Sequence, residues 1–361
     1  MTRVLMIDPK LPDMKKIDQA AAYLIQGKLV AFPTETVYGL GANALDHQAV
    51  ESIFIAKGRP FHDPLIVHIA SLEMISQVAQ NIPAAALHLA DHFWPGPLTL
   101  ILPRHPRIPA QVSAGLNTVA VRMPAHPIAL ALIERARVPV AAPSANRFGH
   151  TSPTSAAHVL ADLQDRIELV IDGGSSTVGV ESTVLDMTQA TPVILRPGGI
   201  TQEDLAKVAG AVLLRSDLPD QDQEAAMPSP GMLSRHYAPH ATMILFESKD
   251  AASACRQMSS EAKSLLKSGK RVGVLTADED LEFFESLSVH VERIGSSQNL
   301  AQIANHLYSA IRSLDEIQVD FILARSYGTK GLGMAILDRL RRAATKIIPL
   351  DNFGEDSDVE V

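Results

Sequence analysis

The sequence has little cysteine and no long apolar run. Its 361 residues include one cysteine, Cys255, so no disulfide can form within the chain. A single cysteine fits a reducing compartment such as the cytoplasm. No run of about 18 apolar residues is present, so we expect no membrane-spanning helix and no membrane partner. The N-terminus also lacks the long apolar segment of a signal peptide, which again favours a cytoplasmic protein.

Several standard motifs are missing as well. There is no Gly-x-x-x-x-Gly-Lys-Ser/Thr loop, so any ATP is held in another way, and there is no Gly-x-Ser-x-Gly nucleophile elbow. Histidine and cysteine do not cluster as zinc requires; His236 and His240 are four apart, but Pro239 interrupts the helix that would align them. We therefore predict no protein metal site. The net charge of −8 disfavours a general nucleic-acid binder, although a local basic patch remains compatible with it.

The length predicts two domains, and 46% apolar residues suffice for a real core. In the N-terminal part, the spacing of apolar residues and the positions of capping residues, glycine and proline predict a mixture of helices and strands. The expected strands are 29–32, 65–69, 98–102, 119–122, 138–142, 169–172 and 193–195. The expected helices are 17–26, 48–56, 72–79, 84–93, 127–135, 154–163 and one that begins after Thr201, where Thr201 and Asp204 resemble a capping box.

The composition changes in the second half. An acidic stretch at 217–226 and a proline-rich stretch at 227–240 read as a linker. After it, strands expected at 243–247, 271–276, 289–294, 321–326 and 346–350 alternate with helical segments, which is typical of an open parallel sheet. We therefore predict an α/β protein with domains at 1–213 and 242–350, a linker at 214–241, and an acidic tail at 351–361.

The stretch from Phe32 to His68 is the strongest candidate for a functional site. Pro33 ends a strand and is followed by Thr34, Glu35 and Thr36, which either bind a small polar ligand or cap a turn. Hydroxyls and cations together suit an anion, because phosphate needs hydrogen-bond donors and positive charge.

Two cations and a histidine complete this stretch. Lys57 and Arg59 are two apart, so on an extended segment both would point toward one polyphosphate; the alternative is two solvated surface cations. His68 shares a strand face with Ile66, opposite Leu65, Val67 and Ile69, and is either a ligand or a core histidine bonded to the backbone.

Further polar residues follow other strands. Ser144 and Asn146 come after the strand at 138–142, where α/β sheets place their ligands, although both are also common turn formers. Arg122 and Arg196 each end a strand. Each arginine alone reads as a surface residue, and their convergence is what predicts an anion site.

Taken together, these motifs resemble those of the YrdC-like domain, in the same order along the chain. The matching segments are Phe32–Gly41, Lys57-x-Arg59-Pro60, Pro64–His68, Pro95–Thr99, Ser144-x-Asn146, Gly179–Thr183 and Arg196–Gly198. Ser229–Met232 with His236–Pro239 resembles the linker of the two-domain members, the L-threonylcarbamoyladenylate synthases. The resemblance implies a YrdC-like twisted sheet with flanking helices, followed by a smaller, Rossmann-like parallel α/β domain.

The resemblance also implies a reaction. L-threonine, bicarbonate and ATP, with Mg²⁺ accompanying ATP, would give threonylcarbamoyl-AMP and pyrophosphate. The product would pass to a downstream tRNA threonylcarbamoyl transferase, for the threonylcarbamoyladenosine modification beside the anticodon. Direct contact with tRNA is left open.

Residue roles follow from the same resemblance. Lys57 and Arg59 are expected to be catalytic. Threonine would contact the positions that match Thr36, His68, Arg122, Ala142 and Ser182. ATP would contact those that match Arg59, Asp63, Thr118, Ser144, Asn146, Ser152, Arg196 and Tyr237. Many members carry asparagine where this chain has Asp63, and a carboxylate near a triphosphate repels it unless a cation intervenes. With Tyr237 against ATP, the linker would fold over the site as a lid.

Two other functions remain compatible with the residues alone. An RNA-binding protein of translation or ribosome assembly would use the same cations on phosphates, with steep salt dependence and no need for threonine. A carbamoyltransferase-like enzyme is the other, since YrdC-like domains also occur in carbamoyl-transferring hydrogenase maturation proteins.

Overall fold

The computed structural model describes residues 1–217 and 237–351. These residues form two compact units. Within the described ranges, the N-terminal unit holds 1–148 and 152–217, and the C-terminal unit holds 149–151 and 237–351. Most of the expected linker and tail therefore lies outside the described residues.

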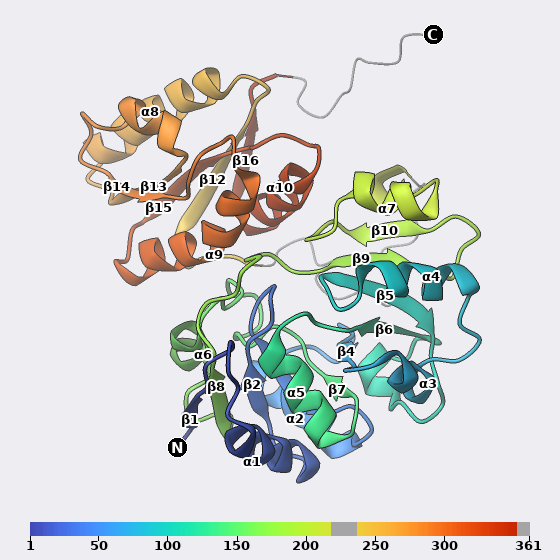
Figure 1. The fold of residues 1–361 in the computed structure, drawn as a ribbon. Helices are drawn as coiled ribbons and strands as arrows, with labels where there is room; N and C mark the ends of the chain where they lie inside the picture. Colours follow the sequence, from blue (N-terminus) through green and yellow to red (C-terminus); the bar gives the residue numbers. More distant parts are fainter. Residues whose placement is uncertain (218–236, 352–361) are drawn as a thin grey trace. The chain divides into compact units, whose positions relative to one another are not determined.

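The N-terminal unit is built on one mixed sheet of eleven strands (Figure 1). In spatial order these are β1 (Arg3–Met6), β8 (Leu169–Asp172), β2 (Val30–Phe32), β3 (Gly39–Asn43), β7 (Val140–Ala141), β4 (Ile66–His68), β6 (Thr118–Arg122), β5 (Leu98–Pro103), β9 (Thr183–Asp186), β10 (Val193–Arg196) and β11 (Leu213–Leu214). Parallel and antiparallel pairs are interspersed: β4 pairs parallel to β6 but antiparallel to β7. The mixed α/β architecture predicted from the sequence is confirmed.

Helices cover both faces of this sheet and form two apolar cores. They are α1 (Met14–Ile25), α2 (His47–Lys57), α3 (Ile75–Val78), α4 (Ala84–Phe93), α5 (Pro127–Ala136), α6 (Ala156–Leu163) and α7 (Gln202–Ala209), with 3₁₀ turns at Leu72–Met74, Ala110–Ser113 and Arg215–Asp217. Side chains of α1 and α5 pack on Val30 and Phe32 in one core. Side chains of α2, α4, α6 and α7 pack with Leu65, Val67 and Ile69 in the other.

The helix ends follow the expected local chemistry at two positions and depart from it at one. Thr201 accepts a hydrogen bond from the Asp204 amide and donates its hydroxyl to Asp204 Oδ2, so the predicted cap of α7 is confirmed. Gly58 ends α2 in the left-handed conformation, with φ of 65°. Helix α1 begins at Met14, three residues earlier than expected, because the side chain of Asp13 accepts from the amides of Lys15 and Lys16 and caps the helix there.

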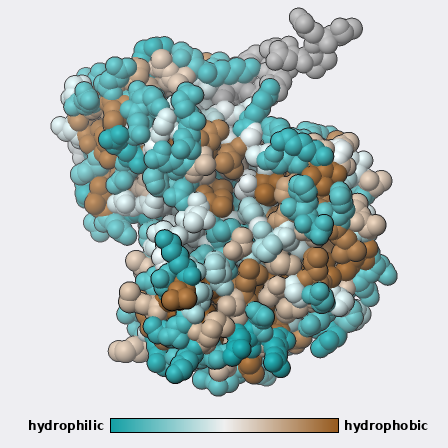
Figure 2. Space-filling model, viewed as in Figure 1, coloured by the Kyte–Doolittle hydropathy of each residue, from teal (hydrophilic) through white to brown (hydrophobic). Residues whose placement is uncertain are grey.

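The C-terminal unit is a sheet of five parallel strands, as the alternation predicted (Figure 1). Its order is β14 (His290–Arg293), β13 (Val272–Thr276), β15 (Phe321–Arg325), β12 (Thr242–Glu247) and β16 (Lys346–Pro349). The helices are α8 (Ala251–Lys267), α9 (Leu300–Glu316) and α10 (Leu332–Ala343), with a 3₁₀ segment at Asp278–Phe283. Figure 2 shows hydrophilic residues over most of this unit's visible surface. Among the described residues, no helix is long and apolar enough to cross a membrane.

Candidate active site

The central strands of the N-terminal unit have one face on which strand residues alone form an apolar cluster. Its members are Ile66, Ile101, Ala120, Val184, Val193 and Leu195. Because side chains two apart along a strand share a face, His68 lies on the face of Ile66, and Arg122 on that of Ala120. The predicted alternation in residues 65–69 is confirmed. This face therefore carries an imidazole and a guanidinium beside apolar side chains.

Arg122 is held from three sides. Its Nε donates to the Gly96 carbonyl at 3.2 Å and its Nη1 donates to Thr36 Oγ1 at 2.9 Å. Its Nη2 lies 2.6 Å from Glu35 Oε1, and both side chains are buried. Thr34 fixes the loop that delivers these partners, because its hydroxyl accepts from the amides of Thr36 and Val37. The turn after Pro33 is therefore capped by the side chain of Thr34, and the same turn brings Thr36 and Glu35 against the Arg122 guanidinium.

His68 is the neighbour of Arg122 across the parallel β4–β6 pair. The imidazole is buried, and among the described residues its Nδ1 has no hydrogen-bond partner. Burial, followed by the charge of Arg122, lowers the pKa of His68 to about 3. The ring is therefore neutral at physiological pH and presents one unpaired polar atom.

Ser182 and Arg196 lie at the end of the sheet where β4 and β6 finish, as His68 and Arg122 do. The Ser182 hydroxyl is 2.7 Å from that of Thr99, and Arg196 Nη2 donates to the Ser182 carbonyl at 3.0 Å and to its hydroxyl at 3.2 Å. A register shift between Ile194 and Arg196 places Arg196 opposite Val184. Simple alternation would send Arg196 to the other face, so this β-bulge is what turns its guanidinium toward Ser182.

Ser144 and Asn146 lie near the opposite end of β4, where that strand begins. The expected convergence at carboxyl ends of strands holds for His68, Arg122 and Arg196, but β7 runs antiparallel to β4. Ala142, which follows β7, donates its amide to the Ile66 carbonyl at the start of β4, at 2.8 Å. The group of His68, Arg122 and Arg196 and the group of Ser144 and Asn146 therefore lie at opposite ends of β4.

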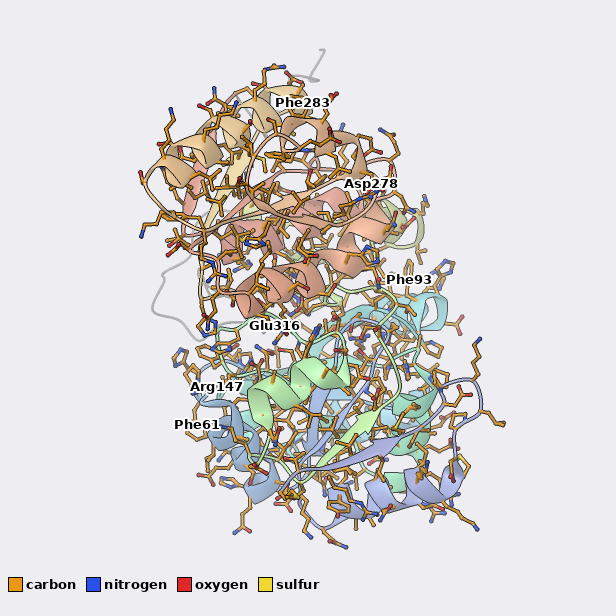
Figure 3. All side chains as sticks on the ribbon, turned by 90° about the vertical axis from the view of Figure 1, so that its left-hand side faces the viewer. Phe61, Phe93, Arg147, Asp278, Phe283 and Glu316 are labelled. Atoms are coloured by element: carbon orange, nitrogen blue, oxygen red, sulfur yellow. The ribbon has the colours of Figure 1, made fainter. Side chains whose placement is uncertain are left out.

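Lys57 fastens the loop that holds Ser144 and Asn146. Its Nζ donates to the Ser144 carbonyl at 2.6 Å and to that of Asn146, while Ser144 Oγ donates to Asn146 Oδ1 at 2.5 Å. The Phe148 amide closes the arrangement by donating to the Lys57 carbonyl at 2.9 Å. Phe61 and Arg147, labelled in Figure 3, mark the segments after α2 and after this loop. Burial, and then the charge of Arg59, lower the pKa of Lys57 well below its usual value.

Arg59 turns in another direction. It donates to the carbonyls of Asp63 and Pro64, at 3.1 and 2.7 Å, and its Nη2 lies 2.9 Å from Asp63 Oδ1. Burial raises the pKa of Asp63, whereas Arg59 and Lys57 lower it. The interpretation that Lys57 and Arg59 extend side by side is wrong, because the left-handed turn at Gly58 separates them. The interpretation as solvated surface cations is wrong too, because both are buried.

The remaining expected ATP contacts are dispersed. Thr118 begins β6, at the far end of that strand from Arg122, and is half-buried. Ser152 is buried and donates to Glu181 Oε1 at 2.6 Å. Tyr237 belongs to the C-terminal unit, where its ring lies 5.6 Å from that of Tyr308. Such packing within the C-terminal unit is the alternative to a ligand role for Tyr237, and its contact with ATP stays a prediction.

Three residues of this region were given no specific role from the sequence, although Glu35 was named with Thr34 and Thr36 as either a ligand contact or a turn cap. Glu35 and Thr99 lie inside motifs that we singled out, and Glu181 lies beside Ser182. All three are buried, and a charged or polar type inside a segment that packs in the core is the signal that points to them. The described residues contain no group of three or more His, Cys, Asp or Glu side chains able to hold a metal ion.

Known proteins resemble the chain along nearly its whole length. A family model described as telomere recombination matches residues 22–198, and one described as the C-terminal domain of threonylcarbamoyl-AMP synthase matches residues 200–345. The threonylcarbamoyl-AMP synthase of Pyrococcus abyssi is 46% identical over 348 residues, which cover 95% of this chain and 98% of the relative. That of Bacillus subtilis is 46% identical over 330 residues, which cover 91% and 93%.

A solved structure agrees with these matches. The crystal structure of Pyrococcus abyssi Sua5 complexed with L-threonine has a TM-score of 0.89 and 45% sequence identity, and the match covers 97% of this chain and 100% of that one. Both the sequence and the fold thus place the chain among enzymes of one kind. The chain belongs to the threonylcarbamoyl-AMP synthase family.

Proposed function

We propose that the N-terminal unit joins L-threonine, bicarbonate and ATP into threonylcarbamoyl-AMP and releases pyrophosphate. The observation that carries the proposal is the Arg122 network, a buried guanidinium with Thr36, Glu35 and His68 around it. A guanidinium recognises a carboxylate through two parallel hydrogen bonds. The relative from Pyrococcus abyssi that resembles this chain was solved with L-threonine, which supports threonine as the substrate here.

In this proposal, neighbouring groups define the rest of the amino acid. Thr36, Ser182 and the unpaired Nδ1 of His68 are the polar atoms available for the threonine hydroxyl. The cluster around Ile66 and Ala120 is the apolar surface available for the methyl group. Ala142, buried beside β4, closes the set.

The nucleotide would extend from Arg196, near the end of β4, toward the start of β4, where Arg59, Ser144 and Asn146 lie. The arginines supply positive charge for the phosphates, because a guanidinium group stays protonated throughout the physiological pH range. Lys57 has a different role, because its ammonium is already bonded to two carbonyls: it fixes the loop carrying Ser144 and Asn146. We place Lys57 in the site as the residue that holds this loop, and Arg59 as the one that meets the phosphates.

The chemistry needs alignment more than it needs a covalent nucleophile. The amine of threonine attacks the carbon of bicarbonate to give a carbamate with loss of one water molecule, and the carbamate oxygen then attacks the α-phosphorus of ATP as pyrophosphate leaves. Cys255 does not serve as a nucleophile, because burial raises the pKa of its thiol to about 12 and it lies in the C-terminal unit. Buried donors that are fixed in advance stabilise the charge that develops on phosphate.

Mg²⁺ would arrive with ATP. It keeps several waters and is commonly bound by one or two carboxylates together with phosphates. The described residues fit that arrangement, since they offer the buried carboxylate of Asp63 beside Arg59 but no cluster of ligating side chains. When bound, the ion would neutralise phosphate charge.

The product is an activated acyl group, and we propose that a transferase passes it to tRNA for the threonylcarbamoyladenosine modification. Membership of an enzyme family favours this function over an RNA-binding role. The test is a reaction with ¹⁴C-bicarbonate, threonine and ATP. Label should enter a nucleotide product with the mass of AMP joined to threonine and one carbonyl. Label that never enters a nucleotide, or enters it without threonine, would contradict the proposal.

A further inference from the structure

Glu35 is a buried carboxylate with an incomplete set of partners. Its side chain is 9% exposed, and one oxygen lies 2.6 Å from Arg122 Nη2. Neither oxygen has a hydrogen-bond partner of good geometry among the described residues. Buried polar groups are almost always hydrogen-bonded, and an exception calls for an explanation such as a missing ligand.

The surroundings of Arg122 show why this exception matters. Each of the three guanidinium nitrogens already faces a partner: Nε faces Gly96, Nη1 faces Thr36 and Nη2 faces Glu35. An incoming carboxylate can form a two-pronged contact only by taking over the edge that now faces Glu35 and Thr36. Glu35 then loses its cation while it stays buried, which is costly unless another positive charge replaces it.

An amino-acid zwitterion brings that charge with it. We propose that Glu35 binds the α-ammonium group of the substrate, so that the Glu35–Arg122 pair exchanges into two pairs, Arg122 with the substrate carboxylate and Glu35 with its ammonium. This inference rests on the proposed function, in which Arg122 binds the carboxylate of threonine. The exchange leaves no buried charge unpaired, and it selects for a free α-amine next to a carboxylate.

The other buried carboxylates of this unit are already engaged elsewhere. Asp63 pairs with Arg59, and Glu181 accepts a hydrogen bond from Ser152. His126 also feels the charge of Glu35, but burial lowers its pKa and leaves it a weaker counter-ion than an ammonium group. Glu35 is thus the described carboxylate that lies against the guanidinium.

The test compares two ligands that differ only in the amine. Calorimetry would give the dissociation constants of L-threonine and (R)-3-hydroxybutyrate, which lacks the α-amine, for the wild-type protein and for Glu35→Gln. We expect Glu35→Gln to weaken threonine at least about tenfold, the loss of one charge-assisted hydrogen bond, and to bind (R)-3-hydroxybutyrate at least as tightly as the wild-type protein does, because no buried carboxylate is then left without its cation. If both ligands weaken alike, Glu35 only orients Arg122 and the proposal fails; unchanged threonine affinity also overturns it.

Two further readings keep the outcome unambiguous. ATP affinity of Glu35→Gln reports whether the variant is folded. If it is not, the wild-type protein decides alone: threonine should bind at least about tenfold tighter than (R)-3-hydroxybutyrate, and equal binding overturns the proposal. A wild-type protein that binds ATP but neither of the two acids would instead refute the proposed function, and the role of Glu35 with it.

Discussion

Replacing Lys57 by methionine tests the loop that the proposed nucleotide site depends on. Methionine keeps most of the buried stem but removes the amino group that donates to the carbonyls of Ser144 and Asn146. Each buried carbonyl left without a donor costs roughly 1–3 kcal/mol. We expect Lys57→Met to lower the free energy of unfolding by about 2–6 kcal/mol at high pH, where burying the lysine costs least.

The dependence on pH follows from the lowered pKa of Lys57 in the folded protein. Between that lowered pKa and the ordinary value of 10.5, the unfolded chain binds the proton more tightly than the folded chain does. The wild-type protein therefore gains stability relative to Lys57→Met as the pH rises toward 10.5, by at most about 1.4 kcal/mol per pH unit.

Urea unfolding at pH 7 and at pH 9 measures this difference. The matched control is Lys207→Met, on the surface of α7: Asp204 raises the pKa of Lys207, so its small effect should not change over this range. ATP affinity should fall in Lys57→Met and stay constant in the control. A difference in stability that does not grow with pH, or intact ATP binding in a folded Lys57→Met protein, would refute the assigned role.

Three further results are expected. Arg59→Ala is made together with Asp63→Asn, so that no unpaired carboxylate is left. The double variant should release pyrophosphate about 10- to 100-fold more slowly, because it loses a contact worth about 1.5–3 kcal/mol. The control is Arg135→Ala on the surface, and an unchanged rate in the double variant would rule out the assignment. Valine should be a far poorer substrate than serine, because a buried polar site rejects a ligand without the hydroxyl more strongly than one without the methyl; equal turnover of valine and threonine argues against the site. Because the pKa of His68 is lowered to about 3, the folded protein should lose about 2 kcal/mol between pH 7 and pH 5 that His68→Phe does not lose, and a variant that loses as much as the wild-type protein would contradict a neutral, buried imidazole.

Local patterns predicted the parts of the structure that depend on local physics. Alternation assigned Leu65 and Val67 to one face and His68 to the other, because a strand offers only two faces. Thr201 was recognisable as a cap because its hydroxyl and Asp204 are three residues apart. The C-terminal sheet followed from the alternation of strands and helices, which in compact domains produces parallel pairing.

Features that depend on a single dihedral or a single register shift were out of reach. The left-handed turn at Gly58 separates Lys57 from Arg59, whereas an extended segment would have aligned them. The bulge before Arg196 reverses the face that alternation gives it. Strands β1 and β3 were missed because one is short and largely exposed, and the other, Gly39–Asn43, is rich in small residues without a clear apolar alternation.

Long-range partners were also invisible in the sequence. Glu35 could be noticed in its loop, but its ion pair with Arg122 joins residues far apart in the chain. The transfer of residues 149–151 to the C-terminal unit has no compositional mark, although in the fold the Ala238 amide donates to the Gly149 carbonyl at 3.0 Å. Such contacts are set by tertiary packing, which a pattern in one segment does not encode.

The initial rate of pyrophosphate release from ATP tests the central proposal most directly. It is measured with all three substrates present and with threonine or bicarbonate omitted in turn, and again for Arg122→Ala. The account predicts release only in the complete mixture, and loss of that release in Arg122→Ala under conditions where ATP still binds. Release that continues without threonine, or survives unchanged in Arg122→Ala, would contradict it.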